Sequence, residues 1–174
     1  MKSSDIAIRR LSSGDEVTYR ALRLRGLKEH PDAFTSGHDE EAAKPLSVTE
    51  ARLAPEADGR MWGTFVDGAL VGAIGLLREP RVKIRHKGEV FGMYVAREHA
   101  GRGVGAALLS YLIGEARREP GLEQLVLTVT ETNVAARTLY EKFGFRSFGV
   151  EPRAIRVDGT YFDKNHMIFL LALP

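Results

Sequence analysis

Apolar and polar residues alternate at the start of the chain and then change to a helical period. Ile6 and Ile8 are separated by one residue, which predicts a short strand. From Val17 onward the apolar residues recur at helical spacing, which predicts a helix that ends at Pro31. Residues 32–55 are largely polar, and we expect them to form only short helical pieces.

Two serines stand at a spacing that begins many helices. Ser13 and Ser47 are each followed three positions later by a glutamate, Glu16 and Glu50. In a capping box the serine hydroxyl and the glutamate carboxylate each accept a hydrogen bond from a backbone N–H at the helix N-terminus. Both pairs therefore predict a helix start.

From residue 60 onward, apolar runs are separated by turns that contain glycine. Asp67-Gly68 and Asp158-Gly159 are typical of hairpins that join antiparallel strands. The predicted strands are residues 61–66, 69–77, 89–95, 122–129, 145–157 and 160–171, and the predicted helices are residues 103–118 and 133–143, the second ended by Gly144. Hairpins in the first half and strand–helix–strand units in the second predict an α/β fold. We expect a mixed, twisted and mostly antiparallel sheet with helices on both faces.

Length and composition narrow the classes of protein to consider. The 174 residues suit one domain covering residues 1–174, and a net charge of +2 without a recognisable binding motif predicts no nucleic-acid partner. The absence of cysteine excludes a thiol nucleophile, a disulfide and a cysteine metal site. The five histidines lack the spacing of metal ligands, so no metal is expected. No apolar run is long enough to cross a membrane and no signal peptide is visible, so we expect a cytoplasmic protein with no membrane partner.

Basic residues gather in one segment of the chain. They are Arg78, Arg81, Lys83, Arg85 and Lys87. Such a group is typical of a solvated loop or an edge strand. It is also suited to attract a phosphate-bearing ligand, and the sequence leaves both interpretations open.

A glycine-rich turn follows one of the predicted strands and leads into a helix. Gly101, Gly103 and Gly105 leave little side-chain bulk around the backbone. The first N–H groups of the helix lack intrahelical partners and, together with the helix dipole, favour a diphosphate. The P-loop motif is absent, and Gly101, Gly103 and Ala106 fit a relaxed dinucleotide motif except that Ala96–Ala100 separate them from the strand. A turn that only lets the helix pack on the strand is the alternative interpretation.

Two segments together give the chain a family resemblance. The first, Ala100-Gly101-Arg102-Gly103-Val104-Gly105, resembles the fingerprint Q/R-x-x-G-x-G/A of the GNAT superfamily of acyl-CoA-dependent N-acetyltransferases, with Ala100 in place of the usual Gln or Arg. The second, residues 133–145, resembles the family's motif N-x-x-A-x-x-L-Y-x-K-x-G-F at every anchored position. The two motifs occur in the family's order with one strand between them, and a looser similarity extends over nearly the whole chain.

The resemblance implies a co-substrate, a cleft and a set of site residues. The co-substrate is acetyl-CoA, and the cleft lies where the parallel strands Glu89–Val95 and Leu122–Val129 splay apart. The Val95 N–H is implied to hold the oxyanion, and Tyr140 to donate a proton to the departing sulfur, although Tyr140 taken by itself better fits a core tyrosine of an amphipathic helix. The residues implied for cofactor binding are Met93, Val95, Gly101, Arg102, Gly103, Val104, Gly105, Ala106, Asn133 and Tyr140, of which Asn133 is also an N-cap candidate.

An amine acceptor must lose a proton before it attacks, because an alkyl ammonium has a pKa near ~10.4. Glu89 is the first candidate for this general base. Counting by two places it on the same strand face as Phe91, Met93 and Val95, although a solvent-exposed strand residue is the alternative. The weaker candidates are Glu40, Glu41, His99 and Glu131. Trp62 is expected to pack in the hairpin of residues 61–77.

The resemblance further implies direct acetyl transfer to a primary amine in a ternary complex, without an acyl-enzyme. The acceptor is expected to enter between residues 24–41 and the final hairpin. We expect a small molecule such as an amino acid or its analogue, and the alternatives are a protein N-terminus or lysine. A non-catalytic acyl-CoA-binding regulatory domain is the hypothesis from a different functional class. A homodimer is compatible with the resemblance, but the sequence shows no interface.

Overall fold

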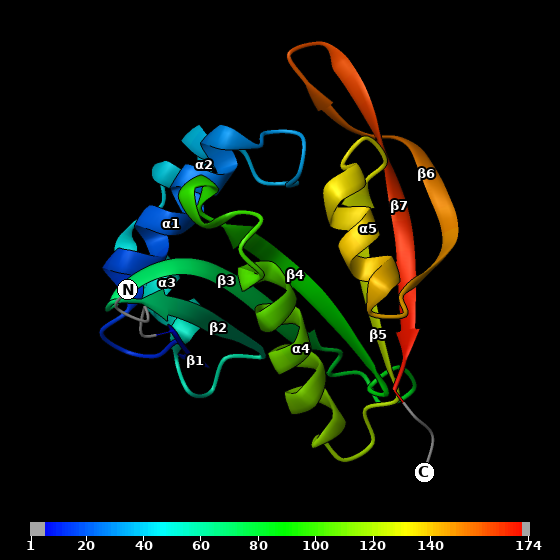
Figure 1. The fold of residues 1–174 in the computed structure, drawn as a ribbon, viewed down its shortest axis with the longest axis horizontal. Helices are drawn as coiled ribbons and strands as arrows, with labels where there is room; N and C mark the ends of the chain where they lie inside the picture. The colour runs from blue at the N-terminus through cyan, green and yellow to red at the C-terminus, as the bar shows by residue number, and fades with distance from the viewer. Residues whose placement is uncertain (1–5, 172–174) are drawn as a thin grey trace.

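Seven strands form one twisted sheet in the order β1-β2-β3-β4-β5-β7-β6 (Figure 1). The computed structural model describes residues 6–171. The strands are β1 (Ile6–Arg10), β2 (Gly59–Val66), β3 (Ala69–Arg78), β4 (Lys87–Val95), β5 (Gln124–Thr130), β6 (Arg146–Val157) and β7 (Thr160–Leu170). Every neighbouring pair is antiparallel except β4 and β5, which are parallel. The mixed, mostly antiparallel sheet is therefore confirmed.

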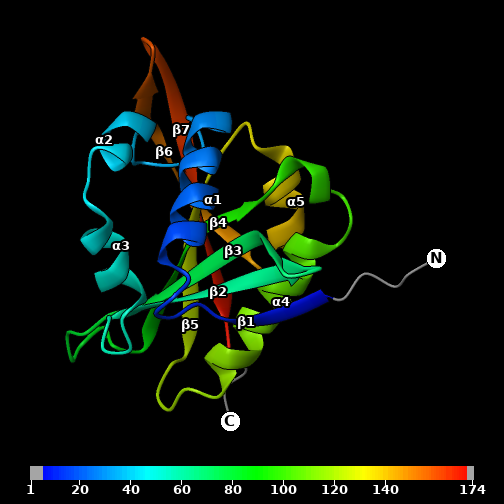
Figure 2. The ribbon, with the colours of Figure 1, turned by 90° about the vertical axis from the view of Figure 1, so that its left-hand side faces the viewer.

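Helices cover both faces of this sheet, as predicted. They are α1 (Glu16–Glu29), α2 (His38–Ala42), α3 (Leu46–Leu53), α4 (Val104–Arg117) and α5 (Val134–Lys142), with a 3₁₀ turn η1 (Arg97–His99) before α4. One buried cluster includes Leu108 and Leu112 of α4, and a second includes Tyr19 of α1 and Leu53 of α3. Figure 2 shows α1 and α4 on opposite sides of the central strands.

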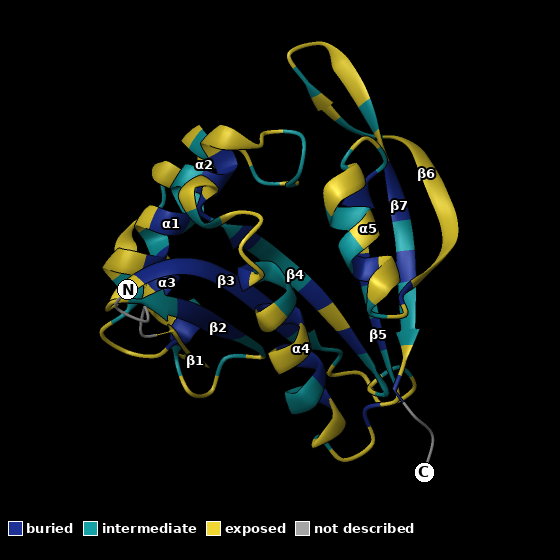
Figure 3. Cartoon of the chain, in the orientation of Figure 1, coloured by how far each residue is buried: buried dark blue, intermediate teal, exposed yellow. Residues whose placement is uncertain are grey.

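Strand β2 supplies both clusters because its side chains alternate between the two faces. Met61 packs in the cluster with α1, whereas its neighbour Trp62 packs in the cluster with α4. Trp62 is only 2% exposed, so its predicted packing role is confirmed. Burial also differs between strands: Figure 3 shows that β3, near the middle of the sheet, is largely buried, whereas β6, at its edge, is largely exposed.

The parallel strands β4 and β5 are paired over a short stretch only. Their register joins Lys87, Gly88 and Glu89 to Gln124, Leu125 and Val126. Beyond Glu89, β4 continues to Val95 and β5 continues to Thr130 without further pairing between them. The two strands therefore diverge after Glu89, which is the splayed arrangement that the resemblance implies (Figure 1).

A bulge in β4 overturns the predicted alternation along this strand. Between Phe91 and Tyr94 the strand advances three residues while β3 advances two, from Gly75 to Ala73, and Gly92 has a φ of 61°. Because one extra residue exchanges the two faces, Phe91 packs with α1 whereas Met93 packs with α4.

The bulge changes which residues of β4 share a strand face with Glu89. By alternation Glu89 shares a face with Phe91, which precedes the bulge. It does not share the face of Met93 and Val95, so that part of the prediction was wrong. The sequence spacing could not reveal the bulge, since glycine in a strand marks a bulge only in some contexts.

The short helices after α1 are confirmed as α2 and α3, but neither predicted capping box forms. Asp15, not Ser13, is the N-cap of α1, and its carboxylate is bound by Arg9 and by the Ser12 N–H. In α3 the N-cap is Pro45, whose extended backbone lets the helix begin at Leu46. Ser47 therefore already lies inside the first turn, where its hydroxyl cannot cap the helix.

Candidate functional site

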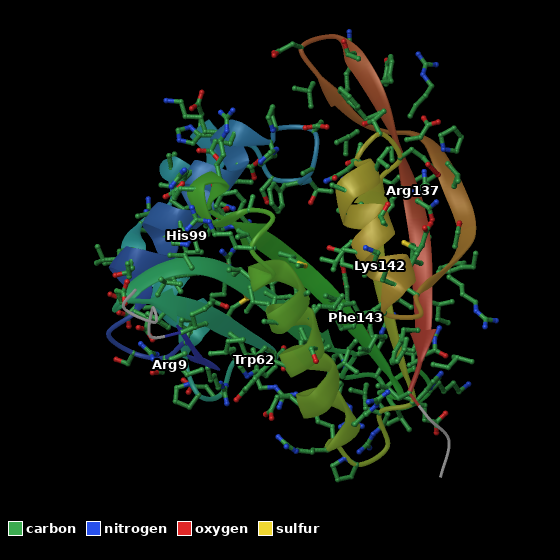
Figure 4. All side chains as sticks on the ribbon, in the orientation of Figure 1. Arg9, Trp62, His99, Arg137, Lys142 and Phe143 are labelled. Carbon is green, nitrogen blue, oxygen red and sulfur yellow. The ribbon has the colours of Figure 1, made fainter. Side chains whose placement is uncertain are left out.

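A cavity of about 540 Å³ lies where β4 and β5 diverge. Its walls come from the end of β4, the turn before α4, the first turn of α4, and α5. Most of the residues predicted for cofactor binding line it: Met93, Val95, Gly101, Gly103, Gly105, Ala106, Asn133 and Tyr140. His99 and Lys142 also line it, and Figure 4 shows them on elements from opposite sides of the opening.

The N-terminus of α4 faces this cavity with unpaired amides. Gly103 is the N-cap with a φ of 82°, and Gly101 has a φ of 72°, both in the left-handed region that favours glycine. The first hydrogen bond of α4 runs from the Ala107 N–H to the Gly103 carbonyl at 2.9 Å. The N–H groups of the three residues between them precede that bond and have no intrahelical acceptor. A helix N-terminus with free amides is generally suited to bind an anionic group.

Two predicted cofactor residues do not place side chains in the cavity. Val104 is 6% exposed, packs in the buried core with other residues of α4, and does not line the cavity. Arg102 is exposed and does not line the cavity. From this turn, Gly101 and Gly103 line the cavity instead.

Gly105 brings α4 close to β4 and α5. A β-carbon at this position would lie 3.2 Å from Met93 Cε and 3.4 Å from Leu139 Cδ2. These distances are near the lower limit of ordinary contacts, so a larger residue would narrow the cavity.

The edge of β4 offers one backbone donor toward the opening. The N–H of Ala96 donates to the Val71 carbonyl of β3 at 2.8 Å. Successive N–H groups of an extended strand point to opposite sides. The Val95 N–H therefore points away from β3, to the side where β5 has separated from β4.

Tyr140 lies on α5 with its phenol buried between the diverging strands. Its Oη donates to Met93 Sδ at 3.4 Å, and its ring packs edge-on against Phe145 at 5.8 Å between centroids. Burial raises the pKa of Tyr140 to about 12. The phenol therefore keeps its proton at neutral pH.

Asn133 begins α5, and its predicted role as an N-cap is confirmed. The Asn133 Oδ1 accepts a hydrogen bond from the Ala136 N–H at 3.1 Å. This cap sets the start of α5 beside the cavity that Asn133 also lines.

A second cavity of about 200 Å³ adjoins the first. Met93, Asn133 and Tyr140 line both cavities, so the two meet at these side chains. Glu89 lines the second cavity and is solvent-exposed. The structure thus brings Glu89 and Tyr140 to a common cavity, although they come from different elements.

The other acidic candidates for a general base have structural partners. Burial alone would raise the pKa of Glu41, but hydrogen bonds from Lys44 and Arg23, with the charge of Arg23, lower it to about 2. Glu131 is ion-paired with Arg137 and accepts a hydrogen bond from Asn165. The Glu41 carboxylate, held by three cations, is therefore a poor proton acceptor.

The two remaining candidates differ in position. Glu40 is exposed on α2 and does not line either cavity. His99 lines the larger cavity beside the glycine turn, rather than the smaller one that holds Glu89.

Sequence reasoning missed Lys164, which lines the smaller cavity from β7. It also missed His30 and Phe34, which contribute to the larger cavity from the end of α1 and the segment after it. No local signal marks these residues, because a lysine in a strand or a histidine after a helix is ordinary on a protein surface. Only the packing of distant elements brings them to the site.

The basic group between residues 78 and 87 lies away from both cavities. Arg78 donates to the carbonyls of Arg85 and Pro120, each at 2.9 Å, and thereby fastens the loop between β3 and β4. Arg81 is largely exposed and pairs with Glu79. The structure favours the solvated-loop interpretation.

Metal clusters and membrane-spanning helices are both absent from the part of the chain that the structure describes. Among residues 6–171, no group of three or more His, Asp or Glu side chains is placed to hold a metal ion. Within the same range, no helix has the length and apolar character needed to span a membrane.

Solved acetyltransferases share this arrangement of sheet and helices. A GNAT-family acetyltransferase from Streptococcus pneumoniae superposes with a TM-score of 0.85, covering 97% of this chain and 100% of that one at 24% identity. The structure of yncA from Salmonella typhimurium, solved with its cofactor acetyl-CoA, gives a TM-score of 0.80 over 98% of this chain and 96% of that one, also at 24% identity. These similarities define the fold class, which is that of the acetyltransferases.

Similarity in sequence identifies the family. The Acetyltransferase (GNAT) family matches residues 25–145, and the chain belongs to this family. A mycothiol acetyltransferase from Thermobispora bispora is 32% identical over 79% of this chain but only 45% of its own length. The L-amino acid N-acetyltransferase AaaT of Escherichia coli is 27% identical over 92% of this chain and 88% of its own length. The chain thus spans less than half of the mycothiol enzyme but nearly all of AaaT.

Proposed function

We propose that this protein transfers the acetyl group of acetyl-CoA directly to a primary amine in a ternary complex. The observation that carries the proposal is the meeting of two cavities at Tyr140. The larger one faces the free amides of α4, and the smaller one contains Glu89. One cavity suits a diphosphate-bearing donor, and the other suits a small acceptor.

The larger cavity fits acetyl-CoA in its chemistry. The amides of Val104, Gly105 and Ala106 would bind the diphosphate at the helix N-terminus. The apolar side chains of Met93 and Leu139 would contact the pantetheine arm. Asn133, which is polar and lies on the same wall, would contact that arm or its surroundings.

The reaction needs three functions from the protein. Glu89 accepts the proton of the ammonium, directly or through water, so that the amine can attack the thioester carbonyl. The Val95 N–H stabilises the oxyanion that forms on that carbonyl. Tyr140 donates its proton to the sulfur as the carbon–sulfur bond breaks, which gives free CoA and the acetylated amine.

The smaller cavity favours a small-molecule acceptor. Its volume of about 200 Å³ is suited to a compound of amino-acid size. The similarity to AaaT, which is named for L-amino acids, supports an amino acid or a close analogue as the first choice.

A panel of primary amines tests the proposal when free CoA is measured as the product. Isothermal titration calorimetry with CoA gives the binding of the donor product independently. We expect CoA to bind and at least one small amine, such as an amino acid, to release CoA from acetyl-CoA.

The outcomes separate the alternatives. CoA binding without turnover of any amine, peptide N-terminus or lysine peptide would favour the regulatory CoA-binding domain. Turnover of peptides alone would instead favour a protein acetyltransferase. Failure to bind CoA would contradict the proposal altogether.

A further inference from the structure

The smaller cavity contains a buried lysine that the proposed reaction does not use. Lys164 lies on β7 with 4% of its surface exposed. Its side chain lines the same cavity as Glu89 and Tyr140. A lysine buried to this degree is rare unless its charge is matched by a partner.

The partners of this ammonium are neutral. The Nζ donates to the Ala33 carbonyl at 2.8 Å and to Thr130 Oγ1 at 2.9 Å. A third contact, to the Asp32 carbonyl at 3.5 Å, is too long to be a good hydrogen bond. One N–H of the ammonium therefore has no well-placed acceptor.

No carboxylate compensates the charge by direct contact. Among residues 6–171, none lies within 4.0 Å of the Lys164 Nζ. Burial lowers the pKa of Lys164, and the more distant charge of Asp32 opposes this only in part. An anion in the cavity would supply both the missing hydrogen-bond acceptor and the missing charge.

A purely structural role does not account for the charge. Lys164 helps to hold the segment after α1, but the Thr130 hydroxyl already donates to the Asp32 carbonyl at 2.6 Å. A neutral donor at position 164 would serve that purpose without the desolvation of an ammonium.

We propose that Lys164 binds the carboxylate of the acceptor and thereby selects α-amino acids over amines that lack an acid group. The inference rests on the proposed function, because it places the acceptor in the cavity that Lys164, Glu89 and Tyr140 share. The carboxylate accepts a hydrogen bond from Nζ while the amine faces the acetyl group. Lys164 is therefore a specificity-determining residue, and it takes no part in proton transfer.

The test compares each amino acid with the amine formed by removing its carboxylate. Suitable pairs are methionine with 3-(methylthio)propylamine and phenylalanine with phenethylamine. For the wild type we expect kcat/KM to favour the amino acid by roughly 10–100-fold, the range of one charge-assisted hydrogen bond. In Lys164→Met this preference should fall close to unity, mainly through a higher KM for the amino acid.

Thr130→Val is the matched control. It removes a hydroxyl that binds both the Lys164 ammonium and the Asp32 carbonyl but keeps the charge. We expect this variant to retain the preference for the amino acid even if its activity falls. CoA binding by calorimetry verifies that each variant is folded.

Several results would overturn the inference. One is a wild type that does not distinguish the two members of each pair, and another is a Lys164→Met variant that loses activity on both equally.

If no amine is acetylated, the proposed function fails, but the role of Lys164 can still be tested by calorimetry. In that case methionine should bind the CoA complex of the wild type more tightly than that of Lys164→Met, and equal binding would contradict it.

Discussion

At the scale of single residues, three observations bear on the proposed role of Tyr140 as a proton donor. It is buried at the junction of two cavities, it has no strong hydrogen-bond acceptor among the described residues, and its pKa is raised to about 12. A weak contact with Met93 Sδ leaves the phenolic proton available to a stronger acceptor. A departing thiolate is such an acceptor.

Tyr140→Phe is therefore expected to lower kcat by roughly 100-fold or more, within the range attributed to general acids. The affinity for CoA should stay nearly unchanged, because the ring keeps its packing against Phe145. The measurements are steady-state CoA release and calorimetry. Tyr111→Phe, which removes a hydroxyl from the outer part of α4, is the control and should behave like the wild type.

The pKa of Tyr140 also predicts the alkaline side of the pH profile. Since the pKa is about 12 rather than the usual 10.0, the protonated phenol is the dominant form until the pH approaches 12. Its loss of the proton should not reduce kcat below about pH 11, while the acceptor amine becomes more reactive as it deprotonates. A profile of kcat between pH 7 and 11 tests this. A decline in kcat centred near pH 10, with the protein still folded by circular dichroism, would argue against Tyr140 as the acid.

At the scale of elements, the N-terminus of α4 depends on a backbone conformation that few residues adopt. Gly103 has a φ of 82°, and an alanine there is strained by about 1–2 kcal/mol whatever space surrounds it. In Gly103→Ala the turn should relax in the free protein and move the amides of α4 out of position. We expect CoA affinity to fall roughly tenfold, since restoring the turn costs part of the binding free energy.

A second glycine of the same helix provides the comparison for calorimetry. A β-carbon added at Gly114 would meet no described atom within 4 Å, and the φ of this residue is not positive. Gly114→Ala should stabilise α4 by up to about 1 kcal/mol and leave CoA affinity unchanged. Equal affinities for the two alanine variants would mean that the turn at Gly103 does not position the diphosphate.

The helices α1, α2 and α3 are joined through one carboxylate. Glu41 of α2 accepts hydrogen bonds from Arg23 of α1 at 2.9 Å, from Lys44 at 2.8 Å and from Arg52 of α3 at 3.0 Å. Its pKa is lowered from 4.5 to about 2. The stabilisation is therefore present above pH 4.5 and is lost as the pH falls toward 2.

Glu41→Gln should lower the free energy of unfolding at pH 7 by about 2 kcal/mol, because three cations lose their common partner. The difference from the wild type should shrink between pH 4.5 and 2, as the wild-type carboxyl also becomes neutral. Urea unfolding at several pH values measures this. A difference that does not change with pH would show that the ion pairs are not its source.

At the scale of the whole molecule, the separation of β4 and β5 divides the sheet into two parts that meet only near Glu89. The proposed donor site takes backbone from the β4 side and side chains of α5 from the β5 side. A ligand that contacts both parts binds the folded state alone, and so it stabilises the whole protein.

Saturating CoA is therefore expected to raise the melting temperature. At a free concentration 100 times Kd the stabilisation is about 2.7 kcal/mol, which corresponds to roughly 5–10 °C for a protein of this size. Differential scanning fluorimetry measures the shift, and Tyr140→Phe should show the same one. Hydrogen exchange should slow both at the turn of residues 100–106 and in α5. Protection of only one of these segments would contradict a ligand that bridges the two parts.

Much of this architecture is determined by the sequence itself. The order of strands and helices, the glycine turn before α4 and the cap at Asn133 depend on residues close together in the chain, so local spacing was sufficient to predict them. The residues that gather around the larger cavity were predicted instead from the resemblance of the two motifs to the GNAT superfamily, since local spacing alone left a simple packing turn as an equal alternative.

The tertiary structure alone decided the rest, and the reason is that these features depend on distant partners. The bulge at Gly92 sets the face of Glu89 through the pairing of β4 with β3. The start of α1 at Asp15 depends on the ion pair with Arg9 from β1. The burial of Lys164 requires β7, β5 and the segment after α1 to converge. A single residue carries no sign of such contacts, because the free energy that fixes them comes from groups far away in the chain.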